Sequence, residues 1–165
     1  MLCSPAATMH AANPSINSSG PEPRLTLKSQ LDDLARVWPW VEALAAQDSL
    51  PADTQFAIQL CLEEALSNIV RHGYRGQPNQ LITIACTVER APAAAELVFT
   101  IEDQAPPFDP FAAAPVAAPT SIQELEPGGQ GIRLMQKFAS RHDYQQLPQG
   151  NRLTLAFAIP PSPNP

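Results

Sequence analysis

The placement of nineteen prolines restricts this chain more than any other feature of its sequence. Proline fixes φ and removes a backbone donor, so it is excluded from most helix interiors and from central strands. The prolines concentrate before residue 24, between residues 105 and 127, and after residue 159. We therefore expect one ordered domain at 24–159 that contains a long loop, with a flexible N-terminal tail at 1–23 and a C-terminal tail at 160–165.

Composition narrows the classes of protein that the chain can belong to. Its 165 residues, 44% of them hydrophobic, suit a single core. A formal net charge of -6 leaves no basic stripe for a phosphate backbone, so we expect no direct binding to nucleic acid. No apolar run approaches the ~20 residues of a membrane span. Three cysteines without CxxC spacing favour a reducing compartment. We expect a cytoplasmic protein with no membrane segment.

Hydrophobic periodicity predicts three helices and about five strands. The strongest signal is a 3.6-residue pattern over 54–72 that Gly73 ends. Another helix is predicted over 31–47, kinked or split by Pro39, and a third follows the GGQG sequence. Runs of strands with segregated helices predict an α+β two-layer sandwich, in which a mixed, mostly antiparallel sheet carries three helices on one face. The predicted strands are 24–28, 81–89, 96–102, 143–147 and 152–159.

One flank of the 54–72 helix carries side chains suited to chemistry. Glu64, Asn68 and His72 recur every four residues, which predicts that they stack and face one small volume. Magnesium prefers oxygen ligands and keeps several waters while it bridges phosphates, so the amide oxygen of Asn68 suits it. Glu64 would then poise the nucleophile of a phosphoryl transfer by accepting its proton. The alternative is an ordinary solvated helix face.

Two further segments carry residues suited to a nucleotide. Asp103 ends an apolar strand, and its carboxylate would accept a hydrogen bond from an exocyclic amino group, which selects adenine over guanine. Gly128, Gly129 and Gly131 precede a helix, where glycine permits close backbone approach and the helix start offers unpaired N–H groups to an anion. The alternatives are a turn-capping aspartate and a flexible glycine turn.

In this order and spacing, EEALSNIVRHGY, EDQAPPFDP and GGQGIRLMQKFAS resemble the asparagine box and two glycine boxes of the GHKL ATPases. The closing GNRLTL resembles the last strand of that superfamily. The short length and the HGY and PFDP sequences are most similar to the anti-sigma-factor serine/threonine kinases, over about residues 25–159. The resemblance implies a Bergerat-type ATP-binding fold with ATP and Mg²⁺ as cofactors.

By position, the resemblance implies Glu64 as general base, Asn68 as magnesium ligand and Asp103 as the residue that recognises adenine. Thr154 would support adenine beside Asp103. Arg71 and His72 fall where the family often places phosphate-facing residues, with capping or packing as their alternative roles. The remaining nucleotide contacts implied by the resemblance are Gly128, Gly129, Gly131 and Ile132, with Ala105 in the first glycine box.

The first glycine box departs from the family pattern. The usual DxG reads Asp103, Gln104, Ala105 here, so a methyl group narrows the approach of backbone to base. If this position required a positive φ, alanine would cost about 1 kcal/mol or somewhat more. We expect such a cost to weaken nucleotide affinity.

The function implied is an ATP-dependent serine/threonine protein kinase that acts as an anti-sigma factor. Its partners would be a STAS-domain antagonist, which it phosphorylates, and a sigma factor or similar regulator, which it sequesters, and it would form a homodimer. Residues 106–127 would be the lid over ATP. One alternative is a module that acts by sequestration alone, with or without bound nucleotide. Another is the catalytic part of a sensor histidine kinase, which needs a phosphoacceptor helix pair where only a polar tail precedes residue 24.

Overall fold

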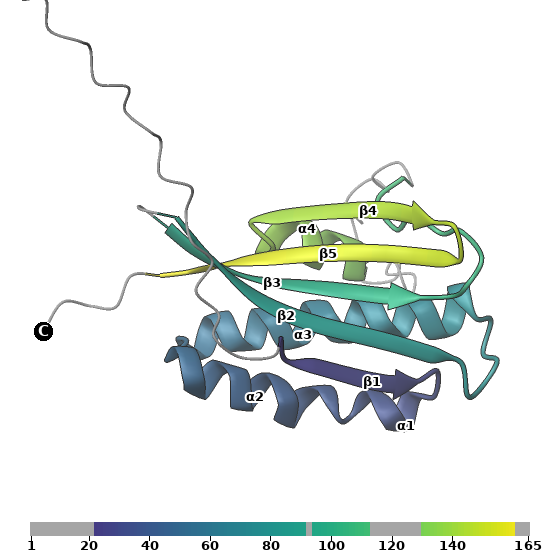
Figure 1. Ribbon diagram of the computed structural model, residues 1–165, viewed down its shortest axis with the longest axis horizontal. Helices are drawn as coiled ribbons and strands as arrows, with labels where there is room; N and C mark the ends of the chain where they lie inside the picture. The colour runs from purple at the N-terminus through teal and green to yellow at the C-terminus, as the bar shows by residue number, and fades with distance from the viewer. Residues whose placement is uncertain (1–21, 92–93, 113–129, 161–165) are drawn as a thin grey trace, which may run out of the picture.

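An antiparallel sheet of five strands forms one layer of the protein in the computed structural model, which describes residues 22–91, 94–112 and 130–160 (Figure 1). The strand order is β1-β2-β3-β5-β4. Every neighbouring pair is antiparallel, so the sheet predicted to be mostly antiparallel is antiparallel throughout. The strands are β1 (Arg24–Lys28), β2 (Leu81–Ala91), β3 (Ala94–Asp103), β4 (Arg141–Leu147) and β5 (Gly150–Ile159).

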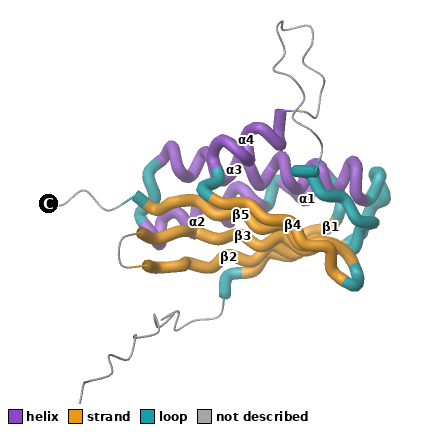
Figure 2. Tube along the Cα trace, turned by 90° about the horizontal axis from the view of Figure 1, so that it is seen from above, coloured by secondary structure: helices purple, strands orange, loops and turns teal. Residues whose placement is uncertain are grey.

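The helices form the second layer, on one face of the sheet (Figure 2). This arrangement confirms the predicted α+β two-layer sandwich. Within the described residues, no helix is long and apolar enough to cross a bilayer. Apart from Glu22, Pro23 and Pro160, the two predicted tails lie outside the described residues. The helical elements are α1 (Leu31–Leu34), α2 (Val37–Asp48), α3 (Ala52–Asn68), the π-helical turn η1 (Ile69–Gly73) and α4 (Gln130–Phe138).

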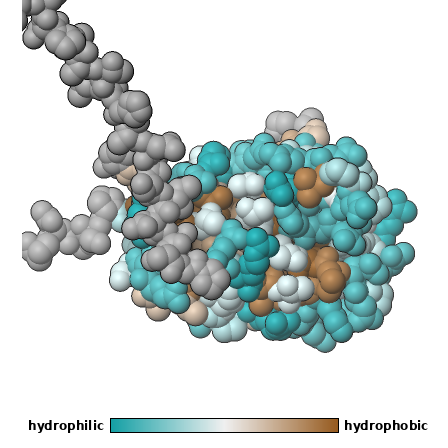
Figure 3. Space-filling view, in the orientation of Figure 1, coloured by the Kyte–Doolittle hydropathy of each residue, from teal (hydrophilic) through white to brown (hydrophobic). Residues whose placement is uncertain are grey.

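Strand alternation decides which side chains reach the helix layer. Leu153 and Leu155 of β5 are buried against the helices, whereas Arg152 and Thr154 line the opposite, helix-free face of the sheet. The part of that open face that is visible beside the grey residues is mainly hydrophilic (Figure 3). Because successive side chains of a strand point to opposite faces, one β5 residue in two is available to a site between the layers.

Proline splits the first predicted helix, as the sequence indicated. The helix breaks at Ala35 and Arg36, between α1 and α2. Pro39 is the third residue of α2, where the backbone N–H has no intrahelical acceptor in any case. The break therefore places the proline at a position where its missing donor costs little.

Candidate active site

Asn68 is the last residue of α3, at the point where the helix widens into η1. The N–H of Tyr74 donates to the carbonyl of Ile69 at 2.8 Å, a span of five residues that defines a π turn. Such turns are frequent at functional sites. Asn68 is buried, but Arg71 and His72 are exposed. The prediction that His72 stacks beneath Asn68 is wrong, because the wider turn changes the rotation of the residues after 68.

A cavity between the layers collects residues from separate segments of the chain. Asn68 of α3, Asp103 at the end of β3 and Met135 of α4 all line it. Its volume is about 20 Å³, room for about one water molecule. The remaining lining residues are Ala65, Ile69, Phe108, Pro110, Tyr144, Asn151 and Leu153.

Asp103 is a buried carboxylate with one oxygen occupied. Its Oδ1 accepts hydrogen bonds from the N–H of Ala105 at 2.8 Å and from Nδ2 of Asn151 at 2.9 Å. Among the described residues, no group donates to Oδ2. Burial raises the pKa of Asp103, and the hydrogen bonds from Asn151 and Ala105 partly offset that rise. The free Oδ2 suits a ligand donor such as the amino group of adenine.

Ala105 adopts the position of the usual glycine without backbone strain. The non-glycine residues with positive φ in the described chain are Ser49, Arg75 and Asn79, so the expected cost of a positive φ at Ala105 does not arise. The Ala105 side chain is buried, and a Cβ added to Gly73 would lie 3.0 Å from its methyl carbon. The methyl group therefore lies against a glycine of η1.

The Glu64 side chain lies against the first turn of α4. A Cβ added to Gly131 would lie 2.9 Å from Cβ of Glu64, and the Glu64 carboxylate would be closer still. Gly131 thus belongs to the helix, where it provides the space that the half-buried Glu64 side chain fills. Ile132 packs against the core. Gly128 and Gly129 lie outside the described residues.

The loop after Asp103 contacts η1 through two rings. Phe108 stacks on His72 with ring centroids 6.1 Å apart, and Phe108 also lines the cavity. His72 thus contacts a lining residue without lining the cavity itself.

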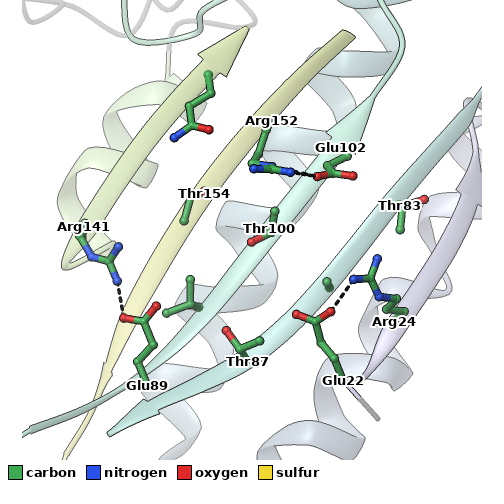
Figure 4. A pocket seen from close by; sticks show the side chains of 13 residues that line it. Glu22, Arg24, Thr83, Thr87, Glu89, Thr100, Glu102, Arg141, Arg152 and Thr154 are labelled. Carbon is green, nitrogen blue, oxygen red and sulfur yellow. Dashed lines mark hydrogen bonds and ion pairs between the residues drawn. The ribbon is translucent and has the colours of Figure 1, made fainter. Parts of the chain in front are cut away.

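A larger hollow lies elsewhere, on the open face of the sheet, with a volume of about 390 Å³ (Figure 4). It is crossed by ion pairs such as Arg152 to Glu102 at 2.7 Å. Thr154 lines this hollow (Figure 4), so it lies on the opposite face from Asp103. The prediction that Thr154 supports adenine beside Asp103 is therefore wrong, because of strand alternation.

Sequence reasoning missed Asn151, which pairs with Asp103 across β3 and β5. Its side chain is buried and lines the cavity. The signal was available, because counting back by two from the apolar Leu155 and Leu153 places residue 151 on the same inward face. Tyr144, which donates its hydroxyl proton to Oδ1 of Asn151 at 2.7 Å, carried no such signal.

Asn68 and Asp103 fit the groups that a magnesium nucleotide would require. The amide of Asn68 lines the cavity, and no described residue forms a side-chain hydrogen bond with it. The described residues contain no cluster of three or more His, Cys, Asp or Glu side chains able to hold a metal. One amide oxygen combined with phosphate oxygens is a ligand set that magnesium accepts.

Gly150 lies at the turn between β4 and β5, directly against the backbone of Asp103. Gly150→Ala is therefore expected to lower the free energy of unfolding by about 3 kcal/mol or more. Its φ is +119°, and an added Cβ would lie 2.8 Å from Cα of Gln104. The measurement is the free energy of unfolding in urea. The control is Gly76→Ala, at φ +75° with nothing within 4 Å, which should cost about 1 kcal/mol. Equal losses in the two variants would refute the packing argument.

The fold is an α+β sandwich with a small cavity between the sheet and the helices, lined by Asn68 and Asp103. Comparison with known proteins assigns this fold to a family. Residues 27–157 match the family described as the histidine kinase-like ATPase domain. The chain belongs to this family.

Within the family, the chain is an ATPase or kinase domain of the anti-sigma factor and BtrW type. It is 34% identical over 116 residues to the serine/threonine-protein kinase BtrW of Bordetella bronchiseptica. The aligned region covers 70% of this chain and 79% of that protein. It is 32% identical over 111 residues to the anti-sigma F factor of Halalkalibacterium halodurans, covering 67% and 72% of the two chains. Identity to the anti-sigma F factor of Geobacillus stearothermophilus is 27% over 115 residues, covering 70% and 75%.

Proposed function

We propose that the chain is an ATP-dependent serine/threonine protein kinase that acts as an anti-sigma regulatory factor. It phosphorylates a STAS-domain antagonist and sequesters a sigma factor or similar regulator. The observation that carries the proposal is the meeting of Asn68 and Asp103 at one cavity, from two of the motifs that resemble GHKL boxes. The similarity to a serine/threonine kinase and to anti-sigma F factors supports the choice of partners.

Each site residue has a separate task in this proposal. Asp103 accepts a hydrogen bond from the adenine amino group through Oδ2, and Asn68 offers its amide oxygen to magnesium. Glu64, one helical turn before Asn68, accepts the proton that the substrate hydroxyl loses as it attacks the γ-phosphorus. Bound ATP would supply the phosphoryl group and leave as ADP, and Mg²⁺ held by Asn68 would neutralise the charge on the phosphates. The backbone of Gly131 and of the adjoining glycines, with Ile132, Arg71 and His72, contacts the phosphates.

The cavity must enlarge for this function, because about 20 Å³ does not hold a nucleotide base. Phe108 and Pro110 line it and belong to the loop that follows β3. Phe108 is 40% exposed and held by a ring contact with His72, so its displacement breaks few buried contacts. We propose that movement of this loop admits ATP. Residues 113–127 of the predicted lid lie outside the described residues.

Asn68→Ala is expected to remove the magnesium-dependent part of ATP affinity. Loss of even an outer-shell partner of a metal ligand costs ~10- to 100-fold, so loss of the ligand itself should weaken binding at least about tenfold with Mg²⁺ present. Calorimetric titration with ATP, with Mg²⁺ or with EDTA, measures the effect. The control is Ser67→Ala, a buried neighbour on α3 that does not line the cavity. A magnesium-dependent gain that persists in Asn68→Ala would sink the metal assignment.

A non-catalytic interaction module is the second candidate, and the small size of the cavity favours it. The two candidates differ in one mass measurement. Purified chain is incubated with a STAS-domain partner, ATP and Mg²⁺, and the partner is then weighed by mass spectrometry. The kinase proposal predicts a gain of one phosphoryl group on a serine or threonine of the partner. Tight partner binding without that gain would favour sequestration alone.

The proposed site of action is the cytoplasm. The two cysteines in the described part of the chain, Cys61 and Cys86, are free and buried. Burial is the main cause that raises the pKa of each thiol to about 12, so neither is ready to form a thiolate. Free cysteines without a disulfide are typical of a reducing compartment.

A further inference from the structure

Asn151 uses both ends of its buried amide at the cavity. Its Nδ2 lies 2.9 Å from Oδ1 of Asp103, 3.1 Å from the carbonyl oxygen of Ala105 and 3.3 Å from that of Pro106. Its Oδ1 accepts from the hydroxyl of Tyr144 at 2.7 Å. Two amide protons are thus shared among three acceptors, and the amide has one consistent orientation.

The contacts of Asn151 fix which oxygen of Asp103 is free. The N–H of Ala105 and Nδ2 of Asn151 both donate to Oδ1, so Oδ2 is the oxygen left for a ligand donor. A carboxylate held on one side cannot rotate to present its occupied oxygen. Oδ2 of Asp103 is therefore held in one position as the acceptor for a ligand donor.

Partners on both sides of the Asn151 amide set its orientation, and Tyr144 is the side chain that holds its oxygen. A hydroxyl that donates to Oδ1 requires the oxygen of the amide, and not the nitrogen, to face β4. Burial is the main cause that raises the pKa of Tyr144, so its hydroxyl stays protonated and remains a donor at neutral pH. Reversal of the amide would point Nδ2 at the hydroxyl and leave the Asp103 carboxylate without that donor.

The same amide also holds the loop that closes the cavity. Besides its contacts with the carbonyl oxygens of Ala105 and Pro106, it accepts from the N–H of Phe108 at 3.4 Å. Phe108 lines the cavity, so a single side chain ties the base-recognising carboxylate to the residue that has to move.

We infer that Asn151, oriented by Tyr144, is the positioning residue that makes the site selective for adenine and couples base binding to the Phe108 loop. The inference rests on the proposed function, since it deepens the role of the same cavity. Asn151 acts through Asp103 and need not touch the nucleotide. Its loss should therefore lower the preference for adenine over guanine as well as the affinity.

The test is calorimetric titration of the full chain with Mg²⁺-ATP and Mg²⁺-GTP between pH 5.5 and 8. Asn151→Ala is expected to weaken ATP binding about tenfold or more, because a hydrogen bond to a charged group is lost, and to narrow the ATP-to-GTP ratio. Tyr144→Phe should also weaken ATP binding and narrow the ATP-to-GTP ratio, but each change should be smaller. Thr154→Val, on the other face of β5, is the control and should bind like the wild type.

Asn151→Asp separates positioning from simple loss of packing. It places a second carboxylate beside Oδ1 of Asp103, and two such groups share a proton because like charges disfavour double ionisation. ATP affinity of this variant should therefore rise as the pH falls. The wild type has a single carboxylate at this place and should lack that rise, because burial raises the pKa of Asp103 and a falling pH can only protonate its acceptor.

Thermal unfolding without nucleotide shows which variants fold. If Asn151→Ala does not fold, the inference is tested with Asn151→Asp and Tyr144→Phe. Suppose that the wild type binds ATP and Asp103→Asn does not. If the folded Asn151 variants then show the ATP-to-GTP ratio and the pH profile of the wild type, the inference about Asn151 is wrong, but the proposed function still stands. Absence of ATP binding by the wild type would overturn the proposed function and the inference with it.

Discussion

Glu64→Gln is expected to slow phosphoryl transfer by about 10²- to 10⁴-fold, the range that a positioned general base contributes. Glutamine keeps the size and shape of the side chain that lies against Gly131, so the packing between α3 and α4 is retained. An amide cannot take the proton of the attacking hydroxyl. Nucleotide affinity should therefore stay close to the wild-type value while the rate falls.

The measurement for Glu64→Gln is a single-turnover assay with labelled ATP and the STAS-domain partner. Neither Glu63 nor Glu64 lines the cavity. Glu63→Gln is the matched control, because Glu63 is the adjacent, exposed residue of the same helix, whereas Glu64 is half-buried against Gly131. The control should transfer phosphate at the wild-type rate. Equal rates for Glu64→Gln and wild type would refute the assigned base, and equal losses in both variants would point to a general charge effect.

Asp103→Asn is expected to lower ATP affinity by at least about 100-fold, since a site that loses its hydrogen-bond acceptor rejects the matching donor strongly. Asn151 donates to Oδ1, so the substituted amide would turn its oxygen toward Asn151 and its nitrogen toward the ligand. A donor would then face the adenine amino group, whereas the carbonyl of guanine would accept from it.

The readout for Asp103→Asn is the ratio of ATP to GTP affinity in the same titration. We expect the ratio to fall far more than in Glu64→Gln, which leaves base recognition intact. The unfolding transition without nucleotide checks that the variant folds. An unchanged preference for ATP would contradict the role of Asp103 in base recognition.

Much of the fold follows from patterns that are local in the sequence. The apolar repeat over 54–72 predicted α3 because a long helix with one buried face requires it. Strands β2 and β3 were predicted from the periodicity over 81–89 and 96–102, and Pro39 marked the break before α2. These features depend on residues that are close in the sequence, so a single sequence was enough to predict them.

The parts of the site that the sequence did not predict depend on backbone geometry and on strand register. Nothing in the composition of IVRHG distinguishes a π turn from the end of an α-helix, so His72 was placed on the wrong flank. Thr154 was assigned by motif position, although alternation from Leu153 and Leu155 places it on the open face. The role of Asn151 arises from its pairing with Asp103, and that register links strands distant in the sequence.

If the three motif segments surround one nucleotide site, a single ligand should affect all of them, and backbone NMR with ¹⁵N-labelled chain can detect this. Titration with Mg²⁺-ATP is predicted to shift the amide signals of Asn68, Ala105 and Gly131 together, with one common dissociation constant. The signals of Thr83 and Thr154, on the open face of the sheet, should stay in place. No shifts at saturating nucleotide, or shifts confined to the open face, would show that these segments do not form a nucleotide site.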